Sequence, residues 1–208
     1  MLTFNPERHV YTEDGQEIPS VTQVIRFLNV DKAAKADPWL RDAAADCGSR
    51  IHEYCMLADY EELPNDVDYD CVGYVNAYLD FLRDYTPVWA GIERIVSGGP
   101  IESRYAGTVD RYGELMGLDA VVDIKTGSSI NKLSCGAQLF AYATSDELSL
   151  WHRRSQKSRA LFVLHLFKDG TYKLIDYNSS EISTAAQAWR CCAEINGLMA
   201  KKGRTKHE

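Results

Sequence analysis

The stretch GTVDRYGELMGLDAVVDIKTG, residues 107–127, decides the fold because it reads as two strands joined by a tight turn. A turn centred on 116–117 places Asp110 directly opposite Asp123 on the neighbouring strand. Successive side chains alternate between the two faces of a sheet, so Asp123 and Lys125 share one face. The stretch therefore predicts a hairpin that carries two carboxylates and an ammonium group into an apolar sheet.

The two opposed carboxylates need a compensating positive charge. Directly opposed residues have Cβ atoms about 5 Å apart, so Asp110 and Asp123 would repel each other. Burial would add to that cost. A divalent cation between them reverses the sign, because oxygen ligands suit Mg²⁺ or Mn²⁺. Lys125 would then orient or deprotonate a water, or stabilise charge on a phosphate oxygen, although a surface Asp–Lys pair on an ordinary hairpin is the alternative.

The order of the remaining elements predicts the fold class. Helices come first, then three strands, a helix, two strands and a last helix, which indicates an α/β (α+β) chain with a mixed central sheet flanked by helices. We expect apolar residues on one face of the 68–85 helix. We expect an extended arm over 1–19 and a short helix that begins at Ser20, followed by helices over 37–60, 68–85, 134–153 and 183–200. The predicted strands span 88–98, 103–115, 117–127 and, as a hairpin, 159–178. The apolar face of the 68–85 helix holds Val72, Val75, Tyr78, Leu79 and Leu82.

Length and composition bound the domain count and the compartment. The chain has 208 residues, of which 45% are hydrophobic and 25% charged. We expect one domain over 1–208, with an arm and helices over 1–87 and a core over 88–200. Neither a membrane span of eighteen apolar residues nor a secretory signal is evident, so we expect a cytoplasmic protein without a membrane partner.

The net charge of −7 is unevenly distributed. The segment 59–70 holds six acids and no base, so the rest of the chain is near −1. We interpret that segment as a solvated loop, with a protein-contact surface as the alternative. Basic clusters over 151–159 and 201–207 are interpreted first as solvated faces, with nucleic-acid contact as the alternative, so charge alone does not exclude a nucleic-acid partner.

The six cysteines form no CxxC pair. Their spacing suits neither a zinc site nor an iron–sulfur cluster, so we expect free thiols. They are residues 47, 55, 71, 135, 191 and 192.

Several motifs, in order, resemble those of the PD-(D/E)XK nuclease superfamily, in its RecB-like and phage-exonuclease branch. GTVD followed by VVDIKTG is similar to the catalytic pair of motifs, with Val109 in place of the proline of the superfamily name. The segment 48–53, GSRIHE, resembles an upstream element whose histidine ligates a metal. Glu93 resembles an acid on the first core strand, and QLFAY over 138–142 resembles the QxxxY element. The opening HVYTEDGQEIPSVTQVI, 9–25, is similar to that of phage and prophage members.

The resemblance implies a restriction-endonuclease-like core and a role for each matched residue. The metal ligands would be His52, Asp110, Asp123 and the carbonyl of Ile124, with Lys125 acting on the attacking water. Glu93 would support the metal or the lysine. From the residues alone, a half-buried hydrogen-bonded histidine is the favoured interpretation of His52, and an edge-strand salt bridge is the alternative for Glu93. The implied nucleic-acid contacts are Gln138 and Tyr142 on one helix face, Thr126 and Ser128 after the lysine strand, and a rim of Trp151, Arg153, Arg154, Lys157 and Arg159.

These expectations together predict a Mg²⁺- or Mn²⁺-dependent deoxyribonuclease, a phosphodiester hydrolase without an iron–sulfur cluster. By analogy with end-processing members we favour an exonuclease of DNA ends or single strands, in recombination, repair or phage DNA processing. A recombination or phage protein partner and a homo-oligomer stay open. The alternatives are a structure-specific endonuclease and a catalytically silent DNA-binding partner with a nuclease fold.

Overall fold

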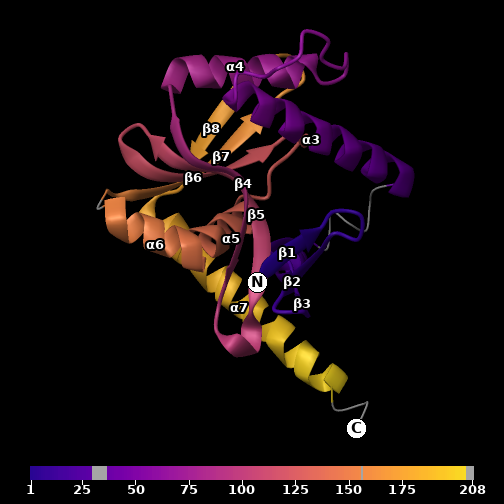
Figure 1. Ribbon diagram of the computed structural model, residues 1–208, viewed down its shortest axis with the longest axis vertical. Coiled ribbons are helices and arrows are strands. Elements are labelled where there is room, and N and C mark those ends of the chain that lie inside the picture. The colour runs from indigo at the N-terminus through magenta and orange to yellow at the C-terminus, as the bar shows by residue number, and fades with distance from the viewer. Residues whose placement is uncertain (30–36, 156, 205–208) are drawn as a thin grey trace.

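A five-stranded sheet forms the centre of the computed structural model, which describes residues 1–29, 37–155 and 157–204 (Figure 1). Strands β6 and β7 run parallel and the other neighbours run antiparallel. The sheet is therefore mixed, and the predicted fold class is confirmed. Its strands, in spatial order, are β4 (Val88–Gly98), β5 (Tyr105–Leu115), β6 (Leu118–Lys125), β7 (Arg159–Leu166) and β8 (Tyr172–Asp176).

The β5–β6 hairpin has the predicted register. Leu115 pairs with Leu118, and the ladder continues to Arg111 opposite Val122. The connecting residues 116 and 117 both have positive φ, as a two-residue hairpin turn with the strands' twist requires. One further step along this register sets Asp110 opposite Asp123.

The sheet forks at that step. Beyond Arg111, β5 keeps its pairing with β4 as far as Tyr105, whereas β6 keeps its pairing with β7 as far as Lys125. The N–H of Ile124 then has no partner on β5's main chain and donates instead to Oδ2 of Asp110, at 2.6 Å. β5 and β6 are therefore no longer paired beyond this point, and the polar side chains of the hairpin lie where the two strands separate.

Helices cover both faces of the sheet (Figure 1). On one face, α3 (Pro38–Asp59) and α4 (Val72–Tyr85) pack against Val122, Ile124 and Leu164 through one apolar core. On the other face, α5 (Lys132–Ala143) and α7 (Ser179–Arg204) share a second core with Val121 and Val163. Alternate residues of β6 thus enter different cores, as the period of a strand requires.

A small N-terminal sheet packs beside the fork. Its antiparallel strands are β1 (Leu2–Asn5), β2 (Val10–Glu13) and β3 (Gln16–Ile18). The Tyr11 hydroxyl lies 2.9 Å from Oγ1 of Thr108, which ties β2 to β5. Ser20 then caps α1 (Val21–Val24) as predicted, and the 3₁₀ helix η1 (Ile25–Asn29) follows.

Two sequence predictions about helices are wrong in detail. The single helix expected over 134–153 is two, because α5 ends at Ala143, with Thr144 as its C-cap, and α6 spans Asp146–Ser155. The Thr144 hydroxyl donates to the carbonyl of Phe140, a local bond of the kind that competes with helix continuation.

Among the described residues, no helix is long and apolar enough to cross a membrane.

The predicted face of α4 is also rotated. Val72 and Leu79 stay 38% and 39% exposed, whereas Val75, Tyr78 and Phe81 are buried. The helix packs on the sheet and on α3 at once, so its buried stripe is set by two neighbours.

Candidate active site

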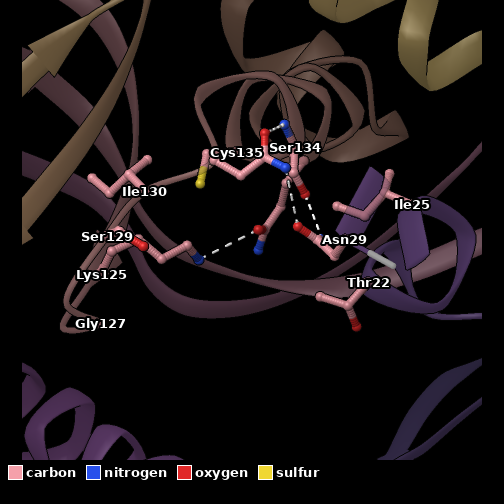
Figure 2. Close-up of a pocket in the computed structure, with 11 residues that line it drawn as sticks. Thr22, Ile25, Asn29, Lys125, Gly127, Ser129, Ile130, Ser134 and Cys135 are labelled. Atoms are coloured by element: carbon pink, nitrogen blue, oxygen red, sulfur yellow. Dashed lines mark hydrogen bonds between the residues drawn. The ribbon is translucent and has the colours of Figure 1, made fainter. Parts of the chain in front are cut away.

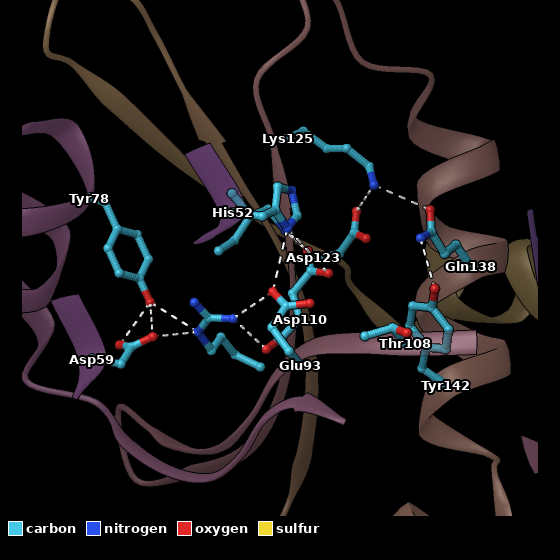
Figure 3. Close-up of polar contacts among 12 residues, drawn as sticks. His52, Asp59, Tyr78, Glu93, Thr108, Asp110, Asp123, Lys125, Gln138 and Tyr142 are labelled. Carbon is cyan, nitrogen blue, oxygen red and sulfur yellow. Dashed lines mark hydrogen bonds and ion pairs between the residues drawn. The ribbon is translucent and has the colours of Figure 1, made fainter. Parts of the chain in front are cut away.

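The fork brings the predicted catalytic and metal-ligating side chains together from five elements (Figure 3). Asp110 comes from β5, and Asp123 and Lys125 from β6. The other side chains reach the same place from α3, β4 and α5; they are His52, Glu93, Gln138 and Tyr142.

His52, Glu93 and Asp110 form a set of potential metal ligands. One ligand atom from each lies within 4.8 Å of the others. Nδ1 of His52 is 3.5 Å from Oε1 of Glu93 and 3.7 Å from Oδ1 of Asp110. Burial alone would lower the pKa of His52, but the two carboxylates outweigh it and the pKa is raised. The imidazole therefore sits in a field that attracts positive charge.

Asp123 is a buried carboxylate with a single close partner among the described residues. Its side chain is 1% exposed, and neither oxygen accepts a well-aligned hydrogen bond from the described residues. Its sole close partner there is Lys125, whose Nζ lies 2.6 Å from Oδ2 as an ion pair. Burial raises the pKa of Asp123 to about 6; Lys125 opposes that rise and Asp110 adds to it. Such a site fits a divalent cation, because hard cations take carboxylate oxygens as ligands.

Lys125 keeps its positive charge and contacts a side chain of α5. Burial lowers the pKa of Lys125, but Asp123 and Asp110 outweigh burial and the pKa is raised. Its Nζ also donates to Oε1 of Gln138 at 3.3 Å, and Nε2 of Gln138 donates to the Tyr142 hydroxyl at 3.1 Å (Figure 3). The shared helix face predicted for Gln138 and Tyr142 thus lies against the lysine.

A buried arginine, which the sequence analysis missed, positions Glu93. Nη1 of Arg111 lies 3.0 Å from Oε1 of Glu93, and Nε lies 2.6 Å from Oδ2 of Asp59. Asp59 also accepts hydrogen bonds from Tyr78 and from Trp89. Arg111 and Asp59 are 0% and 1% exposed, so reading 59–70 as a solvated loop is wrong at its first residue.

The signal for this cluster was present in the sequence: Arg111 directly follows Asp110 within an apolar strand. The partner of Arg111 could not be predicted from local sequence, because Asp59 lies 52 positions away. Glu93 itself adopts φ of +47°, a conformation that non-glycine residues rarely take. The ion pair with Arg111 offsets that local cost and turns the Glu93 carboxylate toward His52.

Two hollows meet at Lys125. The smaller, of about 200 Å³, lies between the loop after β6, η1 and the start of α5 (Figure 2). There Nδ2 of Asn29 donates to Oγ of Ser134 at 2.8 Å. The larger, a groove of about 880 Å³, runs from Lys125 and His52 to the N-terminal sheet.

The two residues after the lysine strand that were predicted to contact phosphate, Thr126 and Ser128, lie in different surroundings. Thr126 lies beside Gly48 of α3, where an added Cβ would be 3.6 Å from its Oγ1. Ser128 is exposed in the loop that follows. Both residues thus remain near the lysine strand, and their contact with phosphate stays a prediction.

The predicted basic rim does not join this site. Arg153 and Arg154 lie at the end of α6, next to His152, whose Nδ1 is 2.7 Å from Oδ2 of Asp119. Asp119 and Lys125 lie at opposite ends of β6, about 20 Å apart at 3.3 Å per residue. Because β7 runs parallel to β6, the chain has to return to the start of β6 before β7 begins, and α6 carries the rim there.

A second group of potential ligands lies away from the fork. Cys47, Asp70 and Cys71 place ligand atoms within 4.8 Å of one another, which their sequence spacing did not suggest. Asp70, however, already accepts hydrogen bonds from Arg50 at 2.8 and 3.1 Å. The guanidinium group occupies the place where a cation would approach.

Comparisons with known proteins support the fold. The chain is similar to a crystal structure from Eubacterium rectale of a protein named "putative exonuclease", with a TM-score of 0.50 and 14% identity. The match covers 77% of this chain and 68% of that one. No family model matches the sequence, and no curated protein matches it. The chain therefore shares the fold of that protein, and its activity has to be inferred from the site.

Proposed function

We propose that the protein is a metal-dependent deoxyribonuclease that hydrolyses phosphodiester bonds from DNA ends. The observation that carries the proposal is the buried Asp123 carboxylate, which has Lys125 as its one close partner among the described residues and lies in the field of Asp110 and His52, two members of the potential ligand set. A purely structural cluster would satisfy that carboxylate with donors. The PD-(D/E)XK resemblance and the exonuclease name of the structural neighbour point to the same chemistry.

The donor set fits Mg²⁺ or Mn²⁺. Two carboxylates, an imidazole and the carbonyl of Ile124 form a mixed oxygen and nitrogen set, which such cations accept. We assign His52, Asp110, Asp123 and Ile124 as the ligands, with Glu93 as a supporting acid. Bound there, the cation would polarise a phosphate oxygen and lower the pKa of a water.

The residues of the chain have separate tasks in this proposal. Lys125 orients the attacking water and stabilises negative charge that develops on the phosphate. Gln138 holds the Lys125 ammonium at the fork, and Tyr142 holds Gln138 in turn. Glu93, fixed by Arg111, keeps the His52 imidazole facing the carboxylates.

Cleavage of end-labelled linear DNA with Mg²⁺ or Mn²⁺ tests the proposal. Wild type should degrade the linear DNA, and chelation or Lys125→Ala should stop the reaction. Lys173→Ala is the matched control, because Lys173 is an exposed lysine on β8. Cleavage that survives Lys125→Ala would overturn the assignment of the site.

A covalently closed circle separates the rival activities. An exonuclease leaves the circle intact, whereas a structure-specific endonuclease opens it. DNA that stays intact under every metal, with binding retained, would instead support a silent DNA-binding protein with a nuclease fold.

A further inference from the structure

Three aromatic side chains of the N-terminal sheet lie at the far end of the groove that begins at Lys125. Phe4, His9 and Tyr11 all line that groove, together with His52 and Lys125 of the candidate active site. The rings of Phe4 and Tyr11 are stacked, with centroids 4.5 Å apart and planes 30° apart. His9 meets Phe4 edge to face at 5.2 Å. The catalytic residues and this aromatic cluster therefore share one continuous surface.

The aromatic cluster is fixed to β5 through Tyr11 and is exposed to solvent at His9. Tyr11 is 4% exposed and its hydroxyl is tied to Thr108 of β5, so it cannot move away from the catalytic sheet. Phe4 is half-buried on top of Tyr11, and His9 is exposed. A flat ligand could thus stack on Phe4 and His9 over a fixed support.

Because the groove carries little positive charge, it would bind the DNA phosphate backbone only weakly. Of the described residues that line it, Lys125 is the sole lysine or arginine, and Glu53 and Glu93 bring negative charge. Proteins that hold duplex DNA do so mainly through Lys and Arg contacts to phosphates. Stacking on aromatic side chains, in contrast, needs a base whose face is free, which a single strand offers and a duplex hides.

We propose that Phe4 and His9, supported by Tyr11, form a base-stacking subsite that selects unpaired nucleotides of a DNA strand entering the active site. The proposal rests on the proposed nuclease function for the identity of the neighbouring centre. It adds a substrate class: single strands or frayed ends, held by their bases while the phosphodiester lies at Lys125.

Equilibrium binding tests the subsite without any cleavage. Fluorescence anisotropy is measured in EDTA with a fluorescein-labelled oligodeoxythymidylate and with its duplex with oligodeoxyadenylate. Base–aromatic stacking contributes about 1–3 kcal/mol per base, so Phe4→Leu should weaken single-strand binding by about 5- to 150-fold. Phe4→Tyr keeps the ring and should bind as wild type does.

Three controls separate stacking from folding. Phe4→Leu and Phe4→Tyr are compared by thermal unfolding, so that a lost N-terminal sheet is recognised as such. His9→Ala changes an exposed side chain and should weaken single-strand binding without a change in melting temperature. Tyr69→Ala removes an aromatic ring that is 94% exposed outside the groove and should have no effect.

The outcomes are distinct. Unchanged single-strand affinity in both Phe4→Leu and His9→Ala, equal loss for duplex and single strand, or no single-strand binding by wild type would overturn the subsite. Metal-dependent cleavage by wild type alongside any of these results would leave the nuclease proposal standing. Selective loss of single-strand binding, with no cleavage under any metal, would keep the subsite and remove the nuclease proposal.

Discussion

Asp59 and Asp123 are carboxylates that each expose 1% of their side chains, yet their surroundings differ. Asp59 accepts hydrogen bonds from Tyr78, Trp89 and Arg111. Asp123 has an ion pair with Lys125 and no well-aligned donor within the described part of the chain. A buried charge with a set of donors is tolerated in the fold, and removing one of its partners is costly. A buried charge without them is costly unless a ligand completes it, and this contrast separates a structural cluster from a functional one.

The largest effect should follow from breaking the structural cluster. Asp59→Asn leaves the buried Arg111 guanidinium with Glu93 as its remaining ion-pair partner among the described residues. Removing one partner of a buried ion pair costs about 3–5 kcal/mol of unfolding free energy. Urea unfolding followed by circular dichroism measures the loss.

Arg111→Met sharpens the same comparison. It should cost less than Asp59→Asn, because Asp59 keeps its donors Tyr78 and Trp89. Equal losses for the two variants would show that the ion pair, and not the full donor set, stabilises this region.

The next largest effect concerns the functional cluster and falls on catalysis. Lys125→Met keeps the length of the side chain and removes its charge, so cleavage of linear DNA should fall about 10²- to 10³-fold. Unfolding free energy should also fall, because the buried Asp123 loses its ion-pair partner. Initial rates at saturating Mn²⁺ measure the first quantity, and a variant as active as wild type would contradict the role of the lysine.

Metal addition should separate the two clusters directly. At a hundred times its Kd, Mn²⁺ should stabilise wild type by about 2.7 kcal/mol, which a rise in melting temperature detects. Asp123→Asn should abolish that rise and, in EDTA, should itself be more stable than wild type, because it removes one of two repelling buried carboxylates. An Mn²⁺ response that persists in Asp123→Asn would place the cation elsewhere.

The smallest effect should come from a mostly buried pair, Arg104 with Glu13, which ties the N-terminal sheet to the residue before β5. The hydrogen bond from Arg104 lowers the pKa of Glu13 from its ordinary 4.5 to about 2. Its contribution is therefore complete above pH 4.5 and is lost as the pH falls toward 2. About a fifth of each side chain stays in water, so we expect roughly 1 kcal/mol.

Glu13→Gln tests this pair through its pH dependence. The difference in unfolding free energy between wild type and Glu13→Gln should shrink as the pH falls from 5 toward 2. Glu7→Gln, at an exposed glutamate of the same sheet, should show no such dependence.

The hairpin shows how much of the site was readable from local sequence. The register that opposes Asp110 to Asp123, and the shared face of Asp123 and Lys125, follow from a turn position and the period of a strand. His52 and Gln138 were expected through the family resemblance, and the structure places both beside the hairpin. Their roles in cleavage stay predictions.

The basic rim shows where local reasoning stopped. The sequence placed Arg153 and Arg154 in a basic cluster over 151–159, which was predicted to form a nucleic-acid rim. The parallel pairing of β7 with β6 carries them to the other end of the sheet. Chain proximity predicts spatial proximity only when the connection does not cross the length of the sheet.

The sequence by itself determined the mixed sheet, the charged hairpin and the alternation that sends β6 into two cores, because strand period and turn chemistry act over a few residues. Only the tertiary structure decided that the sheet forks at Asp110, that Asp59 pairs with Arg111, and that Phe4 shares a groove with Lys125. These contacts join segments up to about 120 positions apart, and such pairs are selected by how whole layers pack, which no local pattern encodes.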